Sequence, residues 1–247
     1  MRFAIISLGV ALAAAASPAL AQDGDNKGVY LSLNAGVATV SDVRLTYFDQ
    51  GGTFGGTGAQ DTIDFTGDVS SAFAFGGTIG YDFGLIRTDL QIDYSRSKVK
   101  SLTLRQVNGQ NVTLTPADGA DICDYLETEN CTVNGNTIGG DGMKLRQLSA
   151  LANIWVDIPT GGRVTPYVGG GAGIGGYEVG GEGKARFAWQ LGAGLAVDLS
   201  RNIALTIDYR HRQISGARIV DEDFPSAGLN IGKVKTNTFS AGLRFNL

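Results

Sequence analysis

The 247-residue chain has only two cysteines, five prolines and one histidine, and its charge is close to balanced. Beyond the first 21 residues no apolar run reaches the roughly 18 residues that a candidate membrane-spanning helix needs, which excludes a helical membrane protein. The formal net charge is -4, and the lysines and arginines form no basic cluster along the chain. Because nucleic-acid binding depends on such clusters, no nucleic-acid partner is expected.

The apolar run that the chain does have lies at its very beginning. Residues 1–21 combine a positive Arg2, an apolar core and the small residues Ala19 and Ala21 around Leu20. This is the pattern of a secretory signal peptide, with cleavage expected after Ala21. We therefore predict two parts: a signal peptide over residues 1–21 and a single exported domain over residues 22–247.

The two cysteines, Cys123 and Cys131, lie close together in a polar segment. In an exported protein such a pair predicts a disulfide, here closing a short hairpin-like tip within a loop. A zinc site would need further cysteine or histidine ligands, and the single histidine, His211, is far away in the sequence. We predict no metal site and no cofactor.

Glycine is abundant, with 37 residues, and the apolar residues of the exported part alternate with polar ones. In the third segment, for example, Leu90, Ile92 and Tyr94 alternate with Gln91 and Asp93. A period of two is typical of strands with two unlike faces. Eight such segments are predicted, at residues 28–40, 72–83, 87–97, 144–158, 164–177, 184–199, 202–214 and 239–247.

Eight alternating strands are compatible with a soluble β-sandwich or with a barrel, and three features favour the barrel. The strands are longer than the usual 5–6 residues and fit a tilted transmembrane strand of about 9–11 residues. Their connections alternate between short and long, as periplasmic turns and extracellular loops do. The polar faces carry charges, which a sandwich core would reject unless they were paired. The fold class predicted is all-β: an eight-stranded antiparallel up-and-down transmembrane β-barrel.

One glycine-rich stretch imitates a nucleotide-binding motif. Gly171, Gly173 and Gly176 satisfy the spacing G-x-G-x-x-G. That motif requires a strand before it and a helix opening within it, and no helical pattern follows here. Glycine within a strand instead marks curvature or close backbone approach, which a small barrel needs. We interpret the stretch as part of the fifth strand.

Two short motifs carry a resemblance to a known family. The C-terminal residues include Ser240, Gly242, Phe245 and Leu247 in the arrangement of the assembly signal of bacterial outer-membrane barrels, although an aromatic is commoner at the last position. With residues 165–171, TPYVGGG, the chain resembles the eight-stranded barrels of the opacity-protein and OmpA-type family. The resemblance implies a bacterial outer-membrane location and recognition by the outer-membrane assembly machinery.

Charged residues on the inward faces predict a network inside the barrel. The third and seventh strands share the pattern L-x-I-D-Y-x-R, which places Asp93 and Asp208 inwards. The predicted network comprises Asp89, Asp93, Asp208, Arg210, Arg212 and Arg244, with Arg210 at its centre. An eight-stranded barrel has room for little more than side chains, so we interpret the network as a plug. A narrow water path is the alternative.

The predicted function is a structural or surface-contact role in the outer membrane, serving envelope integrity or loop-mediated interaction. The alternative is a small porin of low conductance, and a lipid-modifying enzyme is less favoured because His211 has no nucleophile-and-base context. The expected partners are outer-membrane lipids, including lipopolysaccharide. A surface ligand would contact the long loops at residues 41–70, 98–143 and 215–234. Some loops carry acidic residues, which either bind divalent cations or are simply solvated.

Overall fold

A computed structural model of the chain describes residues 27–126, 129–141, 144–179, 182–220 and 224–247. The predicted signal peptide at residues 1–21 lies outside these described residues. Most of the described chain is strand, joined into antiparallel ladders. No helix in the described part of the chain is long and apolar enough to cross a membrane.

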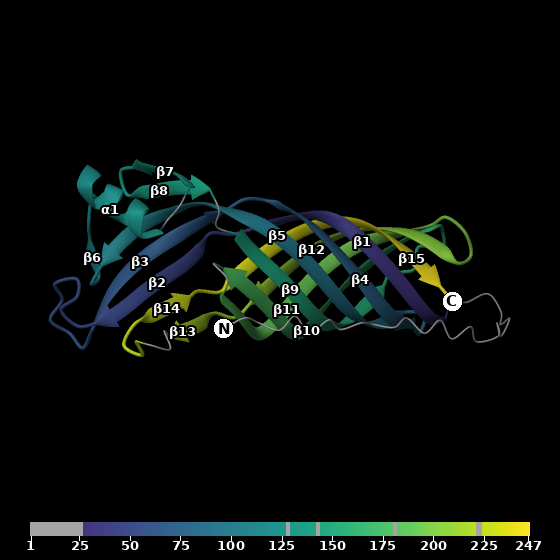
Figure 1. Cartoon of the computed structure of the whole chain (residues 1–247). Helices are drawn as coiled ribbons and strands as arrows, with labels where there is room; N and C mark the ends of the chain where they lie inside the picture. Colours follow the sequence, from purple (N-terminus) through teal and green to yellow (C-terminus); the bar gives the residue numbers. More distant parts are fainter. Residues whose placement is uncertain (1–26, 127–128, 142–143, 180–181, 221–223) are drawn as a thin grey trace.

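Eight of the strands close into a barrel, as the sequence predicts (Figure 1). They are β1 (Gly28–Val40), β4 (Ala72–Asp82), β5 (Ile86–Val107), β9 (Lys144–Asp157), β10 (Val164–Val179), β11 (Glu182–Asp198), β12 (Ile203–Ile214) and β15 (Val234–Asn246). Each pairs with the next in this order, and β15 pairs back with β1. Closure leaves no unpaired edge in the ring, which is the requirement for strands that cross a lipid bilayer.

Short turns join strands at one end of the barrel, called here the turn end, and long connections lie at the other, called the outer end. One outer connection departs from the predicted alternation of short and long: β10 and β11 are paired up to Val179 and Glu182, so the longer connection expected at residues 177–183 is wrong. The sequence predicts the long connections as loops, but the structure builds a second sheet from them. Its strands are β2 (Val43–Gln50), β3 (Gln60–Val69), β7 (Glu129–Asn134), β8 (Thr137–Asp141), β13 (Ala217–Val220) and β14 (Gly228–Ile231), with the short β6 (Gln110–Asn111) and the helix α1 (Pro116–Leu126) beside them. This outer sheet projects beyond the ring in Figure 1.

The long strand β5 belongs to both sheets and shows why the sequence-based boundary was too short. We predicted a strand over residues 87–97, yet β5 runs to Val107. Its pairing with β3 shifts by one residue between Val99 and Ser101, which is a β-bulge at Lys100. A bulge adds one residue to one strand and so interrupts the alternation of faces, although pairing continues beyond it. The eighth strand likewise begins at Val234, earlier than predicted.

The ring has an apolar outer wall and a polar interior. On β9 buried and exposed residues alternate without a break, with polar Gln147, Ser149 and Asn153 inside and Leu148 and Ile154 outside. The outward side chains of the other ring strands are largely apolar too, among them Leu33, Phe75, Leu191, Ile207 and Phe239. Such a reversal of the usual burial pattern fits a wall that faces lipid.

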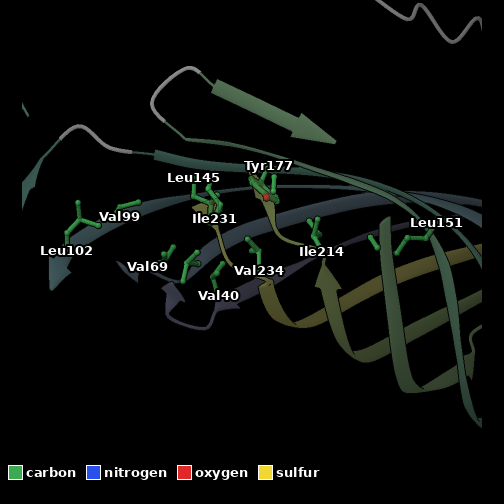
Figure 2. Close-up of a cluster of buried hydrophobic side chains, with 13 residues drawn as sticks. Val40, Val69, Val99, Leu102, Leu145, Leu151, Tyr177, Ile214, Ile231 and Val234 are labelled. Atoms are coloured by element: carbon green, nitrogen blue, oxygen red, sulfur yellow. The ribbon is translucent and has the colours of Figure 1, made fainter. Parts of the chain in front are cut away.

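An apolar cluster lies where the outer sheet meets the ring (Figure 2). It contains Val40, Val69, Val99, Leu102, Leu145, Leu151, Tyr177, Ile214, Ile231 and Val234, together with Val43, Ala188 and Ala217. Its members come from ring strands and from strands of the outer sheet. Burial of this apolar surface fixes the outer sheet to the barrel, and it places a water-excluding layer above the polar interior.

Helix α1 is attached to the outer sheet by the predicted disulfide. Cys123 of α1 is bonded to Cys131 of β7, with the two Cα atoms 5.8 Å apart. The expected hairpin-like tip is therefore wrong, because the bridge joins a helix to a strand. The helix begins with a reciprocal cap, in which the Asp118 N–H donates to Thr115 Oγ1 at 3.2 Å and the Thr115 N–H donates to Asp118 Oδ2 at 2.9 Å.

Loss of the disulfide should loosen α1 and leave the barrel intact. In the variant Cys123→Ser/Cys131→Ser we expect the free energy that holds α1 and its loop in place to fall by roughly 2–3 kcal/mol, since the bridge closes a short loop. Limited proteolysis should then cut residues 112–134 faster than in the wild type. Heat-modifiable migration on a denaturing gel reports the ring, and it should not change. Its loss would show that the ring depends on the bridge.

The connection between β2 and β3 is organised by a buried aspartate. Asp61 Oδ2 accepts hydrogen bonds from the N–H groups of Phe54 and Gly56, the latter at 3.3 Å. A side chain at Gly56 would collide with the Asp61 carboxylate, which explains one glycine of this glycine-rich turn. Burial alone would raise the pKa of Asp61, but these donated hydrogen bonds stabilise the charged form and hold its pKa below the usual value.

This depressed pKa predicts acid sensitivity of the turn. The stability that the charged Asp61 carboxylate gives to the turn is fully present above the pKa of an unfolded aspartate, about 3.9. This stability is lost as the pH falls through the lower pKa of Asp61 in the folded state. The amide resonances of Phe54 and Gly56 should titrate with a midpoint below 3.9 in a detergent-solubilised sample. Asp61→Asn should abolish the titration, and a midpoint at or above 3.9 would contradict the assignment.

Candidate functional site: a packed network inside the barrel

A two-pronged ion pair lies near the turn end of the interior. Arg87 of β5 donates from Nε to Asp157 Oδ2 at 2.7 Å and from Nη2 to Asp157 Oδ1 at 2.8 Å. Its guanidinium lies against the rings of Tyr167 and Tyr30, at 4.7 and 5.7 Å from their centroids. Both partners are buried. Paired donors and aromatic faces together satisfy this charge in the absence of bulk water.

Asp89 is held by three neutral donors. The Tyr30 hydroxyl donates to Oδ2 at 2.8 Å, Trp155 Nε1 donates to the same oxygen at 2.9 Å, and Asn153 Nδ2 donates to Oδ1 at 2.6 Å. Hydrogen bonds to a carboxylate are among the stronger ones in proteins. Tyr30 and Trp155, which the predicted network did not include, thus supply two of the three hydrogen bonds to Asp89.

Amide side chains bridge the middle of the barrel from wall to wall. Gln190 of β11 donates from Nε2 to Gln91 Oε1 of β5 at 2.9 Å and to Asn153 Oδ1 of β9 at 2.7 Å. Asn153 in turn donates to Gln91 Oε1 at 3.2 Å. β5 and β11 are not neighbours in the ring, so these contacts cross the lumen and block it.

The predicted aspartates of the third and seventh strands have cationic partners. Arg212 Nη2 donates to Asp93 Oδ2 at 2.6 Å, which links β12 to β5 across the interior, and Gln91 Nε2 donates to the same carboxylate. Asp208 accepts a hydrogen bond from the Tyr167 hydroxyl, and Arg210 Nη2 lies 3.4 Å from its Oδ1. The shared L-x-I-D-Y-x-R pattern therefore supplies both interior aspartates.

The structure places all six predicted network residues in the interior, where they are buried. It gives Arg210 a less central place than expected, because its contact with Asp208 is the longest of the interior ion pairs. Arg244 has no carboxylate at ion-pair distance among the described side chains, and its guanidinium lies 5.9 Å from the Tyr30 ring centroid. The two-pronged pair, Arg87–Asp157, was not predicted.

Little space remains between these side chains. One cavity of about 20 Å³ is lined by residues that include Tyr30, Asp89 and Arg244. A second, of about 10 Å³, is lined by residues that include Asp93 and Arg212. These volumes are those open to the centre of a water-sized sphere, and a cavity needs at least about 10–15 Å³ by this measure to hold one water molecule. Each of these two cavities is thus close in size to what a single water molecule requires.

The C-terminal residues of the predicted assembly signal lie on β15 and just beyond it. Ser240 is buried in the interior, and Gly242 lies where a side chain would approach Thr206 Oγ1 to 3.0 Å. Leu247 is exposed on the outside. Recognition of these residues by the assembly machinery stays a prediction.

His211 points outwards and has structural contacts. Its Nδ1 lies 2.8 Å from Asn237 Oδ1, and its ring packs 5.7 Å from the Trp189 ring. No carboxylate or hydroxyl nucleophile contacts this imidazole among the described residues. The described part of the chain also holds no group of three or more His, Cys, Asp or Glu side chains arranged to bind a metal ion.

Comparison with known proteins places this geometry in a family. The chain matches the outer membrane protein beta-barrel domain over residues 8–246, and it belongs to that family. The protein is therefore a bacterial outer-membrane barrel. Barrels of this kind have short periplasmic turns and longer extracellular loops, so we expect the turn end to face the periplasm and the outer end to face the cell exterior.

The chain is also similar to other proteins in sequence or in fold. Uncharacterised proteins of Brucella abortus (strain 2308) and Brucella suis biovar 1 (strain 1330) are each 26% identical, with 76% of this chain and 73% of each relative covered. The outer membrane protein OprG from Pseudomonas aeruginosa is similar in fold, with a TM-score of 0.50 and 14% identity over 91% of this chain and 99% of OprG. Neisserial surface protein A matches with a TM-score of 0.49 and 17% identity, covering 89% and 97%.

Proposed function

We propose that this protein is a non-enzymatic structural and surface-contact protein of the outer membrane. The observation that carries the proposal is the filled interior. Side chains of β5, β9, β11 and β12 meet across the lumen, and the two cavities described above are only about 20 and 10 Å³. A barrel closed in this way offers its outer wall and its outer sheet as working surfaces.

The outer sheet supports the surface-contact part of the proposal. It is an ordered extension of the ring, fixed to it by the apolar cluster, and the disulfide attaches α1 to its strand β7. Its end strands β7 and β13 each have one ladder neighbour, β8 and β14 respectively. Ordered surfaces bind at a smaller entropic cost than loops that must be fixed on binding.

The surroundings of His211 support the non-enzymatic part. Hydrolytic chemistry would need a nucleophile, a base and a group that orients the base. The imidazole instead contacts the Asn237 amide and the Trp189 ring. This is the environment of a residue near the membrane interface.

Planar-bilayer recording tests this proposal against the small-pore alternative. Purified barrel should give no steady channels, because the interior network leaves no continuous path. Steady channels that Asp93→Asn or Arg210→Gln abolishes would overturn the proposal in favour of a pore.

The structural role is tested in the source bacterium. Deletion of the gene should raise sensitivity to detergents and to large antibiotics, and expression of the wild-type barrel should restore resistance. A null strain indistinguishable from its parent in these assays would refute a role in envelope integrity.

A further inference from the structure

The outer wall changes character where β5 and β9 leave the apolar belt. Going towards the outer end, the outward residues of β5 are Leu90, Ile92 and Tyr94, followed by Arg96 and Lys98. Those of β9 change in the same way, from Leu148 to Arg146 and Lys144. The four basic side chains Arg96, Lys98, Lys144 and Arg146, all exposed, are called here the cationic patch.

The strand register makes this patch compact. β5 and β9 are neighbours, with Arg96 directly opposite Arg146 and Lys98 directly opposite Lys144. Directly opposed side chains on one face have Cβ atoms about 4.5–5.5 Å apart, and like charges in that relation destabilise a sheet. Two successive like-charged pairs are an unfavourable arrangement unless an anion lies between them.

Among the described residues, few carboxylates of the protein itself neutralise the cationic patch. Arg146 Nη1 lies 2.7 Å from Glu178 Oε1 on β10, which neutralises one of the four charges. The nearby Lys100 lies 3.9 Å from Asp68. No carboxylate of the described side chains lies within ion-pair distance of Arg96, Lys98 or Lys144. Within the described part of the chain, three of the four cations therefore have no carboxylate partner.

The patch lies at the level of the lipid headgroups. Tyr94, the last outward residue of β5 before Arg96, packs on Phe75 of β4 with ring centroids 5.4 Å apart, and Phe73 nearby is 67% exposed. Exposed aromatic residues mark the membrane interface in barrels of this kind. The next outward residues belong to the headgroup region, and because they are at the outer end, the leaflet is the outer one.

We propose that the cationic patch binds the phosphate groups of a phosphorylated glycolipid of the outer leaflet. Two cationic pairs stacked along the strands, three of whose charges have no carboxylate partner among the described side chains, fit a headgroup that carries more than one phosphate. Lysine and arginine near a membrane surface each add to the binding of anionic lipid. The acyl chains would lie against Leu90, Ile92 and Leu148 below the patch.

The inference rests on the proposed structural role in one respect: it names a membrane partner through which that role would act. The lipid-binding inference and the structural role can fail separately. Lipid binding is measured on purified barrel, whereas the structural role is measured on the envelope of a null strain.

The test is native mass spectrometry of the detergent-solubilised barrel, titrated with bis-phosphorylated lipid A. We compare the wild type with Lys98→Gln/Lys144→Gln, which removes one opposed pair. At about fivefold per surface cation, the affinity of this variant, which lacks two of them, should fall about 25-fold. Lys98→Arg/Lys144→Arg keeps the charge and should keep the affinity.

Matched controls separate the patch from general charge attraction. Lys233→Gln/Lys235→Gln removes the same charge from exposed positions on either side of Val234, the first residue of β15, and it should bind lipid A like the wild type. Equal binding by the wild type and Lys98→Gln/Lys144→Gln would overturn the proposal, as would an equal loss in the control variant. Equal uptake of phosphatidylglycerol, or displacement of lipid A by millimolar inorganic phosphate, would overturn the assignment to a glycolipid.

A second measurement does not depend on a lipid titration. In glycolipid-free detergent, Lys98→Gln/Lys144→Gln should unfold at the same or a higher temperature than the wild type, because the like-charge repulsion is relieved. Added lipid A should reverse this order by stabilising the wild type alone. If added lipid A leaves the ranking of the two unfolding temperatures unchanged, the proposal that the cationic patch binds this lipid is overturned.

Discussion

Replacing Arg87 by alanine should destabilise the barrel by about 3–5 kcal/mol, because it leaves the Asp157 carboxylate buried without its partner. The pair is joined by two hydrogen bonds, at 2.7 and 2.8 Å, and both side chains are less than one-tenth exposed. The Tyr30 and Tyr167 rings around Arg87 add apolar contact that alanine would also lose. The measurement is the urea midpoint for unfolding of the refolded barrel in detergent.

The matched control is Arg146→Ala on the outer wall. Arg146 and Glu178 are also 2.7 Å apart, but their side chains are 44% and 39% exposed. Exposed ion pairs contribute about 1 kcal/mol or less, so this midpoint should barely move in glycolipid-free detergent. The double variant Arg87→Ala/Asp157→Ala should recover part of the lost stability, because no uncompensated charge remains. Equal effects of Arg87→Ala and Arg146→Ala would show that water fills the interior.

The alternation of residue types was enough to predict the ring but not the outer sheet. A lipid-facing wall and a polar interior impose a strict period of two on every ring strand, which the sequence displays directly. Beyond the ring, β5 is interrupted by the bulge at Lys100, and β13 and β14 are only four residues each. Short strands with mixed burial carry too few repeats of the pattern to be recognised.

The interior network was predictable in composition and not in pairing. Alternation places Asp89, Asp93 and Asp208 inside, but it cannot say which cation each one meets. In the register of β5 and β9, Arg87 lies opposite Trp155, and Asp157 is two residues further along β9. The contact between Arg87 and Asp157 therefore depends on the strand register, which the alternation does not reveal. The same alternation also places Trp155 inside with Asn153, and this signal could have identified the aromatic donor to Asp89.

The glycine-rich stretch that imitates a nucleotide motif yields the last prediction. β10 carries Gly171 on its inward face, beside Asn153 of β9. A Cβ at Gly171 would collide with the Ala152 carbonyl oxygen and with the Asn153 amide, whose Cγ would be 2.8 Å away. The carbonyl belongs to a paired strand and cannot move freely, and Asn153 connects Asp89, Gln91 and Gln190.

Gly171→Ala should therefore lower the free energy of unfolding by about 3 kcal/mol, at the upper end of the usual cost of overpacking. The same strand offers a control in Gly176, whose added Cβ would meet nothing nearer than 3.8 Å. Gly176→Ala should leave stability unchanged or raise it slightly, because alanine narrows the unfolded ensemble. Urea midpoints of both variants, measured in the same detergent, decide between a packed and a loosely filled interior. A midpoint of Gly171→Ala equal to that of Gly176→Ala would mean that Asn153 has room to move, and that the lumen is not closed at its middle.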